Sequence, residues 1–191
     1  MTKGDQEESY SGSASHLLID RMIGSGEKTL SIICPFISIY YAKILIRQSS
    51  RKRIRVITSN SRISEAAVKM MKRGRGPGHI KLMVYLIMLF VILLVLGIYP
   101  FYIAMIPVMA VVAVFPLMKR QGRSGIEVKV AVESFIHEKI YLSDTYAITG
   151  SANLTYSGTH KNIEHIEETH DAEKLKRLSM HFEDLWKGTE K

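Results

Sequence analysis

The fold is decided by the stretch Phe135-Ile136-His137-Glu138-Lys139-Ile140-Tyr141-Leu142-Ser143-Asp144, which continues to Gly150-Ser151-Ala152-Asn153. Side chains two residues apart in an extended strand share a face, so we expect His137 and Lys139 to point the same way. An imidazole beside an ammonium, facing a turn rich in small hydrogen-bond donors, suits a phosphate group. The sequence therefore predicts a phosphate-binding corner here.

The spacing of this stretch is His-x-Lys-x4-Asp-x5-Gly-Ser-x-Asn. It resembles the signature of the phospholipase D superfamily, and the resemblance continues into Lys161-Asn162-Ile163-Glu164. The matching parts cover roughly residues 8–75 and 124–188. The resemblance implies an α/β fold with a phospholipase D-like mixed sheet flanked by helices, and it does not account for the residues between the two parts.

In the family that the chain resembles, the signature histidine is the nucleophile and forms a phosphohistidine that water or an alcohol then resolves. By that resemblance His137 attacks phosphorus, while Lys139 and Asn153 hold the phosphate. Ser151 is an additional donor to the substrate. Glu164 is expected to hydrogen-bond the far nitrogen of a signature histidine and to fix its tautomer. The family reaction needs no metal and no other cofactor.

Some residues of the pattern have a second interpretation. Asp144 belongs to the signature and is a catalytic candidate, but an aspartate at this point also fits a turn former. For His137 the alternative is an ordinary strand histidine in a catalytically inactive member of the family. His160, His165 and His170 recur every five residues, which puts alternate ones on opposite strand faces without a cysteine nearby, so we expect surface histidines rather than a metal site.

The mechanism implied by the resemblance uses two signature histidines, one that attacks and one that protonates the leaving group. This chain carries one such signature, and nothing near His16, Asp20 or His79 supplies a second. We therefore predict a homodimer in which two copies of His137 meet across a two-fold axis.

The 191 residues suffice for one domain with a core, and the formal net charge is +8 with an isoelectric point near 9.5. Such a charge balance favours nucleic acid or an anionic membrane face as partner. However, much of the excess positive charge flanks an apolar block, where it can simply set the orientation of that block in a membrane. The single cysteine, Cys34, lies in an apolar run and is expected to be a buried strand thiol. Met1–Ser15 has no apolar core, so no secretory signal is expected.

The first part of the domain, residues 9–75, follows residues 1–8 that we expect to be disordered. Alternating strands and helices in this part imply parallel strands with right-handed crossovers. The apolar pattern predicts, in chain order, a helix over Tyr10–Met22, a strand over Thr29–Cys34, a helix over Tyr40–Gln48, a strand over Arg53–Thr58 and a helix over Glu65–Arg73 capped by Ser64.

The second part, residues 124–188, carries the signature. The pattern predicts a strand over Ile126–Val132, a strand pair over His137–Leu142 and Tyr146–Thr149, a further strand over Ile163–Thr169 and an amphipathic helix over Asp171–Lys187. The last helix has one apolar stripe and ends at Gly188.

A charge-free block separates the two parts: no Asp, Glu, Lys or Arg occurs from Leu82 to Met118. As one helix it would run about 55 Å, well beyond the roughly 30 Å of a bilayer core. Gly97 and Pro100 break it into two halves, each about as long as a minimal span. We therefore predict that residues 79–120 form an inserted two-helix transmembrane hairpin, with a re-entrant hairpin or a buried core hairpin as alternatives.

Basic residues flank this block on both sides, while its tip around Tyr99 and Tyr102 is uncharged. The flanking cations are Lys69, Lys72, Arg73, Arg75 and Lys81 before the block, and Lys119, Arg120 and Arg123 after it. Under the positive-inside rule both flanks are cytoplasmic. We expect a multi-pass protein of the cell membrane with the signature-bearing domain and both termini in the cytoplasm.

The leading hypothesis is a membrane-anchored phosphodiester hydrolase of phospholipase D type, with a phospholipid substrate because the hairpin would keep the site near the headgroups. An endonuclease is the alternative, since a run of basic residues is suited to follow a nucleic-acid backbone; a solvated strand edge also explains that run, which comprises Arg47, Arg51, Lys52, Arg53 and Arg55. A phosphatidyltransferase and a non-catalytic membrane scaffold are further alternatives.

Overall fold

A computed structural model describes residues 7–13, 15–73, 88 and 125–189 of the chain. The chain divides into two compact units, residues 1–74 together with 125–191, and residues 75–124. Apart from Met88, the hairpin predicted over residues 79–120 lies outside the described residues. None of the helices in the described part is long and apolar enough to cross a membrane.

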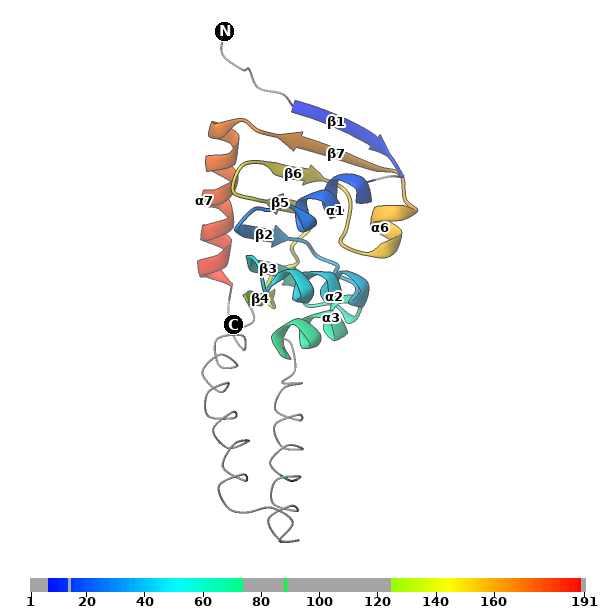
Figure 1. The fold of residues 1–191 in the computed structure, drawn as a ribbon, viewed down its shortest axis with the longest axis vertical. Coiled ribbons are helices and arrows are strands. Elements are labelled where there is room, and N and C mark those ends of the chain that lie inside the picture. Colours follow the sequence, from blue (N-terminus) through cyan, green and yellow to red (C-terminus); the bar gives the residue numbers. More distant parts are fainter. Residues whose placement is uncertain (1–6, 14, 74–87, 89–124, 190–191) are drawn as a thin grey trace, which may run out of the picture. The chain divides into compact units, whose positions relative to one another are not determined.

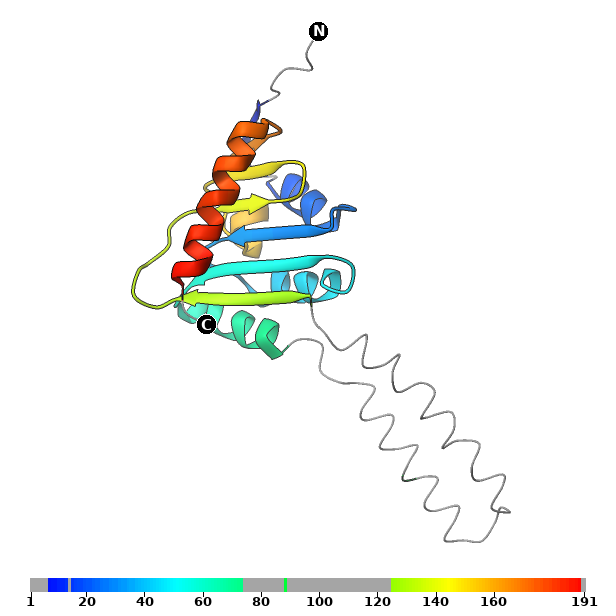
Figure 2. The ribbon, with the colours of Figure 1, turned by 90° about the vertical axis from the view of Figure 1, so that its left-hand side faces the viewer.

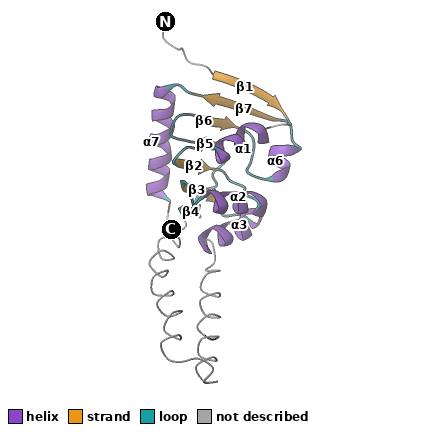
Figure 3. Cartoon of the chain, viewed as in Figure 1, coloured by secondary structure: helices purple, strands orange, loops and turns teal. Residues whose placement is uncertain are grey.

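The first unit is built on one seven-stranded sheet (Figures 1 and 3). Its strands are β1 (Glu7–Gly12), β2 (Thr29–Ile33), β3 (Arg53–Ser59), β4 (Ile126–Ala131), β5 (Ile140–Leu142), β6 (Ala147–Gly150) and β7 (Glu164–Thr169). Its helices are α1 (His16–Gly24), α2 (Ile39–Gln48), α3 (Arg62–Arg73), α6 (Tyr156–His160) and α7 (Ala172–Gly188).

The sheet is mixed, as expected, with the strand order β1-β7-β6-β5-β2-β3-β4. Strands β2, β3 and β4 are parallel, which confirms the parallel strands predicted for the first part of the chain. Strand β5 runs antiparallel to β2, with Ile140 opposite Ile33. The following neighbours, β6, β7 and β1, each pair antiparallel to the strand before them in the sheet.

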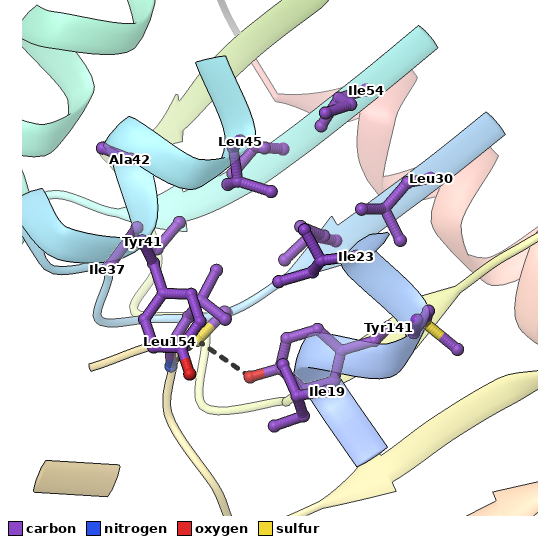
Figure 4. Packing of buried hydrophobic residues seen from close by; sticks show 14 of the residues in the cluster. Ile19, Ile23, Leu30, Ile37, Tyr41, Ala42, Leu45, Ile54, Tyr141 and Leu154 are labelled. Carbon is purple, nitrogen blue, oxygen red and sulfur yellow. Dashed lines mark hydrogen bonds between the residues drawn. The ribbon is translucent and has the colours of Figure 1, made fainter. Parts of the chain in front are cut away.

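Two layers of helices cover the sheet: α1, α2, α3 and α6 lie on one face and α7 crosses the other (Figure 2). Because successive side chains of a strand point to opposite faces of the sheet, each strand contributes to the core on both faces. Ile32 of β2 belongs to the larger apolar cluster under α1 and α2, part of which is drawn in Figure 4. The next residue, Ile33, belongs to the smaller cluster around Phe182 of α7. A core on each face fixes the register of the central strands.

The position of the site follows from the two edges of this sheet. The carboxyl edge is where β2, β3 and β4 end, and the amino edge is where these strands begin. Because β5 is antiparallel to β2, it begins at the carboxyl edge, at Ile140. For the same reason β6 ends at this edge with Gly150, and β7 begins there with Glu164.

Several local predictions were wrong at the N-terminus and around the signature. Residues Glu7–Gly12 form strand β1 on the edge of the sheet, so residues 7 and 8 are not disordered and the first helix begins only at His16. Strand β1 depends on its pairing with β7, and the local sequence alone does not predict it. In the signature, β5 begins at Ile140 rather than His137 and β6 runs over Ala147–Gly150, while helix α6 was not predicted.

Candidate active site

Five of the six predicted site residues come together at the carboxyl edge. His137 and Lys139 precede β5, Ser151 and Asn153 follow β6, and Glu164 is the first residue of β7. The reversal of the chain between β5 and β6 brings the two halves of the signature to one place, since the amide of Gly150 donates to the carbonyl of Lys139 at 3.3 Å.

A buried ammonium lies against an exposed imidazole. The side chain of Lys139 is 7% exposed, whereas His137 is exposed to solvent. Lys139 Nζ donates to the carbonyl oxygen of His137 at 2.6 Å and lies 3.4 Å from His137 Nδ1 and 3.5 Å from Nε2. The expected orientation of the two side chains toward one another is therefore present. A phosphoryl oxygen that approaches the imidazole meets a positive charge already in place.

Glu164 is held by neighbours other than the histidine. Ser151 Oγ donates to Glu164 Oε2 at 2.5 Å, and Asn162 Nδ2 donates to Oε1 at 3.1 Å. Ser151 Oγ also accepts from the amide of His165 at 3.0 Å. Within the described residues both carboxylate oxygens of Glu164 are thus bonded without His137. The expected contact between Glu164 and a signature histidine is not made within one chain.

Gly150 is required by the close approach of two strands at this point. Its φ is +153°, and a Cβ at this position would lie 2.1 Å from the carbonyl oxygen of His165. A side chain at residue 150 would therefore push β6 from β7. The amide of the next residue, Ser151, donates to the same His165 carbonyl at 2.9 Å.

The loop that carries Asn153 rests on two buried side chains. Tyr141 donates its hydroxyl to the carbonyl of Ala152 at 2.8 Å, and Cys34 Sγ accepts from the amide of Leu154 at 3.2 Å. The Tyr141 hydroxyl lies 3.7 Å from Cys34 Sγ, the contact marked by the dashed line in Figure 4. Burial raises the pKa of the Cys34 thiol, so it remains protonated. The burial that the sequence predicted for Cys34 is confirmed, but the thiol lies just beyond the end of β2 rather than in the strand, where it supports this loop.

Asp144 lies at the other end of β5, at the amino edge. Its carboxylate accepts from the amides of Lys28 at 2.7 Å and Thr29 at 3.1 Å, and from the hydroxyl of Thr29. Burial alone would raise the pKa of Asp144, but these hydrogen bonds outweigh it and lower the pKa. The structure does not bring Asp144 to the other five residues, and its contacts tie the turn after β5 to the start of β2.

An exposed aromatic ring beside His137, and a second ring in contact with it, were not anticipated from the sequence. The ring of Phe135, which is 59% exposed, lies 6.2 Å from the imidazole of His137 and 5.8 Å from the ring of Phe36. Phe36 follows β2 and Phe135 follows β4, so the parallel strands bring them together at the carboxyl edge. Because the two residues are about a hundred positions apart, the sequence alone does not show that their rings are close.

The three regularly spaced histidines have separate surroundings. His160 stacks between His16 and Tyr156, at centroid distances of 4.2 and 4.4 Å, and His170 stacks on Tyr146. His165 is exposed on β7. In the described part of the chain no group of three or more His, Cys, Asp and Glu side chains could hold a metal ion.

The basic run proposed as a nucleic-acid contact is not a continuous free surface. Lys52 Nζ donates to the carbonyl of Ser25 at 2.9 Å, and burial lowers the pKa of Lys52. Arg55 pairs with Glu183 at 2.6 Å under α7. Arg53 pairs with Glu127 at 3.1 Å. The run begins at the end of α2 and leads into β3, so it lies at the amino edge and not beside His137.

Comparison with known families and structures agrees with this fold. Residues 19–186 match the family described as cardiolipin synthase, PLD-like domain. The chain therefore belongs to this family of phospholipase D-like domains. None of the curated proteins matches the chain by sequence.

Solved structures share the fold at low sequence identity. The phospholipase D family member Nuc from Salmonella typhimurium has a TM-score of 0.61 and 14% identity, over 98% of this chain and 97% of that one. NucT from Helicobacter pylori has a TM-score of 0.59 and 11% identity, over 97% and 98%. The phosphatidylserine synthase of Haemophilus influenzae Rd KW20 has a TM-score of 0.51 and 14% identity, over 97% of this chain but only 39% of that one.

We predict that Asp144→Asn lowers stability near neutral pH and leaves the catalytic rate of the folded protein intact. Because the folded-state pKa of Asp144 is lowered, its carboxylate stabilises the fold above the unfolded-state pKa, and this contribution is lost as pH falls through the folded pKa. The difference in urea midpoint between wild type and variant should shrink toward zero in acid. A variant with an unchanged midpoint at every pH and a lost catalytic rate would contradict this structural role.

Proposed function

We propose that the protein cleaves phosphodiesters through a phosphohistidine at His137. A lone pair of the neutral imidazole attacks phosphorus, the bond to the leaving oxygen breaks, and that oxygen takes a proton from an acid. Water then attacks the phosphohistidine and releases the imidazole. The observation that carries this proposal is the buried ammonium of Lys139 within 3.5 Å of the exposed imidazole of His137. Asn153 is positioned at the same edge to bind a phosphoryl oxygen.

The acid in this scheme is the same imidazole of a second copy, so the active form is a homodimer. One chain carries one signature, and its described residues include no other imidazole in contact with His137. Nuc and NucT are covered over almost their whole length by this chain, whereas the phosphatidylserine synthase is long enough for two such domains. Since no described histidine of its own chain hydrogen-bonds to Glu164, we propose that it orients the partner's His137.

A phospholipid is the proposed substrate. Several apolar side chains are exposed at the carboxyl edge, and they suit an amphipathic molecule better than a polyanion. Besides Phe135 the exposed ones at this edge are Ile39, Ile63, Val132 and Ile163, between 42% and 82% exposed. The free cations of the described chain do not gather there. An endonuclease is the second candidate, because the net charge of +8 favours a polyanionic partner.

Membrane attachment through the charge-free block is part of the proposal. The block from Leu82 to Met118 carries no charge, and cations flank it on both sides. We propose a protein of the cell membrane with this segment as its anchor and with the catalytic unit and both termini in the cytoplasm.

We predict that detergent-purified protein cleaves a labelled phospholipid in the presence of a chelator and leaves single-stranded DNA and RNA intact. His137→Ala should reduce the rate by at least about a thousand-fold, because the covalent step is lost. His170→Ala is the matched control, since His170 lies at the amino edge, and it should keep its rate. Cleavage of nucleic acid alone would identify the endonuclease, transfer to an added alcohol the phosphatidyltransferase, and no cleavage of any substrate the scaffold.

We predict a dominant effect when wild-type and His137→Ala chains are co-expressed at varied ratios. If each site needs two intact imidazoles, heterodimers are inactive and activity falls with the square of the wild-type fraction. Rates are measured on the purified mixtures, with the ratio of chains determined by mass spectrometry. Activity that falls linearly with the wild-type fraction would rule out a shared site.

A further inference from the structure

The amino edge of the sheet is where the inserted segment leaves the first unit and where the chain returns to it. Helix α3 begins at Arg62 after β3 has reached the carboxyl edge, and its 12 residues lead back over about 18 Å to Arg73. The chain returns at Gly125, whose amide donates to the carbonyl of Ser49 at 3.2 Å. A Cβ at residue 125 would lie 2.5 Å from that carbonyl, so the point of return is fixed against the loop between α2 and β3.

Exposed cations gather around these two points. They lie at the end of α2, in the loop before β3 and in the last turns of α3, and they are Arg47, Arg51, Lys69, Lys72 and Arg73. None of these five side chains has an ion-pair partner among the residues that the structure describes. We call this set the basic edge. One exposed acid nearby, Glu127, is already paired with Arg53.

The apolar sequence next to the basic edge indicates which partner this surface binds. The charge-free block from Leu82 to Met118 begins nine residues after Arg73 and ends seven before Gly125. A cluster of cations next to such a block suits anionic lipid headgroups, and each cation near an anionic leaflet favours contact roughly five-fold. A nucleic acid fits the same charge but not the adjacent apolar segment.

We propose that the basic edge docks on anionic phospholipid headgroups, so that the carboxyl edge with His137 is directed away from that membrane. This inference rests on the membrane attachment in the proposed function. Strands of six residues separate the two edges by about 20 Å. The site then takes its phosphodiester from a facing membrane or from the aqueous phase, and not from the leaflet that anchors the protein. A two-fold axis along the membrane normal lets both copies dock while their carboxyl edges meet.

The test uses the full chain reconstituted into phosphatidylcholine vesicles with or without phosphatidylglycerol. A fluorophore is attached at Ser50→Cys, on the basic edge, or at Val132→Cys, on the carboxyl edge; Cys34 is 0% exposed and does not compete for the label. Quenching by a headgroup-linked quencher reports contact with the bilayer. We expect quenching at residue 50 that is stronger with phosphatidylglycerol and weakens at high salt, and little quenching at residue 132.

Charge-reversal variants test which residues are responsible for docking on the vesicle. Arg51→Glu combined with Lys72→Glu should lower the ratio of docked to undocked protein by at least roughly twenty-five-fold, five-fold for each cation removed. Arg62→Glu, at the opposite end of α3, is the matched control and should leave this ratio unchanged.

Three other outcomes overturn the proposal. Quenching at residue 132 as strong as at residue 50 would mean that the carboxyl edge faces the bilayer. Reversals that leave quenching intact but abolish binding of a single-stranded DNA oligonucleotide would make the basic edge a nucleic-acid surface. Vesicles that float without the protein would overturn the docking and the membrane attachment together. Failure of catalysis alone would leave docking intact, because quenching does not depend on turnover.

Discussion

The antiparallel pairing of β5 with β2 is the constraint on which the site depends. It places the start of β5 opposite the end of β2, with Ile140 across from Ile33, so the residues just before β5 fall at the carboxyl edge. A parallel β5 would carry His137 to the amino edge. The same reversal leads β6 back to Gly150, where the close contact with His165 turns the chain toward Asn153. The antiparallel direction of β5 thus brings both halves of the signature to the carboxyl edge.

Much of this arrangement could be predicted from the sequence. Strands β2 and β3 and helices α2 and α7 follow from apolar periodicity, and the signature predicted the family and the mixed sheet. Contacts between distant segments could not be predicted, because they depend on tertiary placement. Strand β1 exists through pairing with β7, and Asp144 holds Lys28 and Thr29 far from the site that its place in the signature suggested. The contact between Phe36 and Phe135 could not be predicted for the same reason.

The two edges of the sheet differ in character. At the carboxyl edge several apolar side chains are exposed beside the charged Glu133 and Glu138, and the ammonium of Lys139 is buried. The five cations of the basic edge lie at the opposite edge of the sheet. Under the proposed docking of the basic edge, an anchor at that edge directs the site away from the headgroups that hold the protein, so that it acts on a second surface or in the aqueous phase.

The central claim is that His137 becomes covalently phosphorylated during turnover. The most direct measurement is a rapid quench with a substrate labelled at phosphorus, followed by mass spectrometry of the digested chain. The account predicts an acid-labile, base-stable adduct on the peptide that contains His137, absent from His137→Ala chains. Full activity with no adduct on this residue, or with the label on another residue, would contradict it.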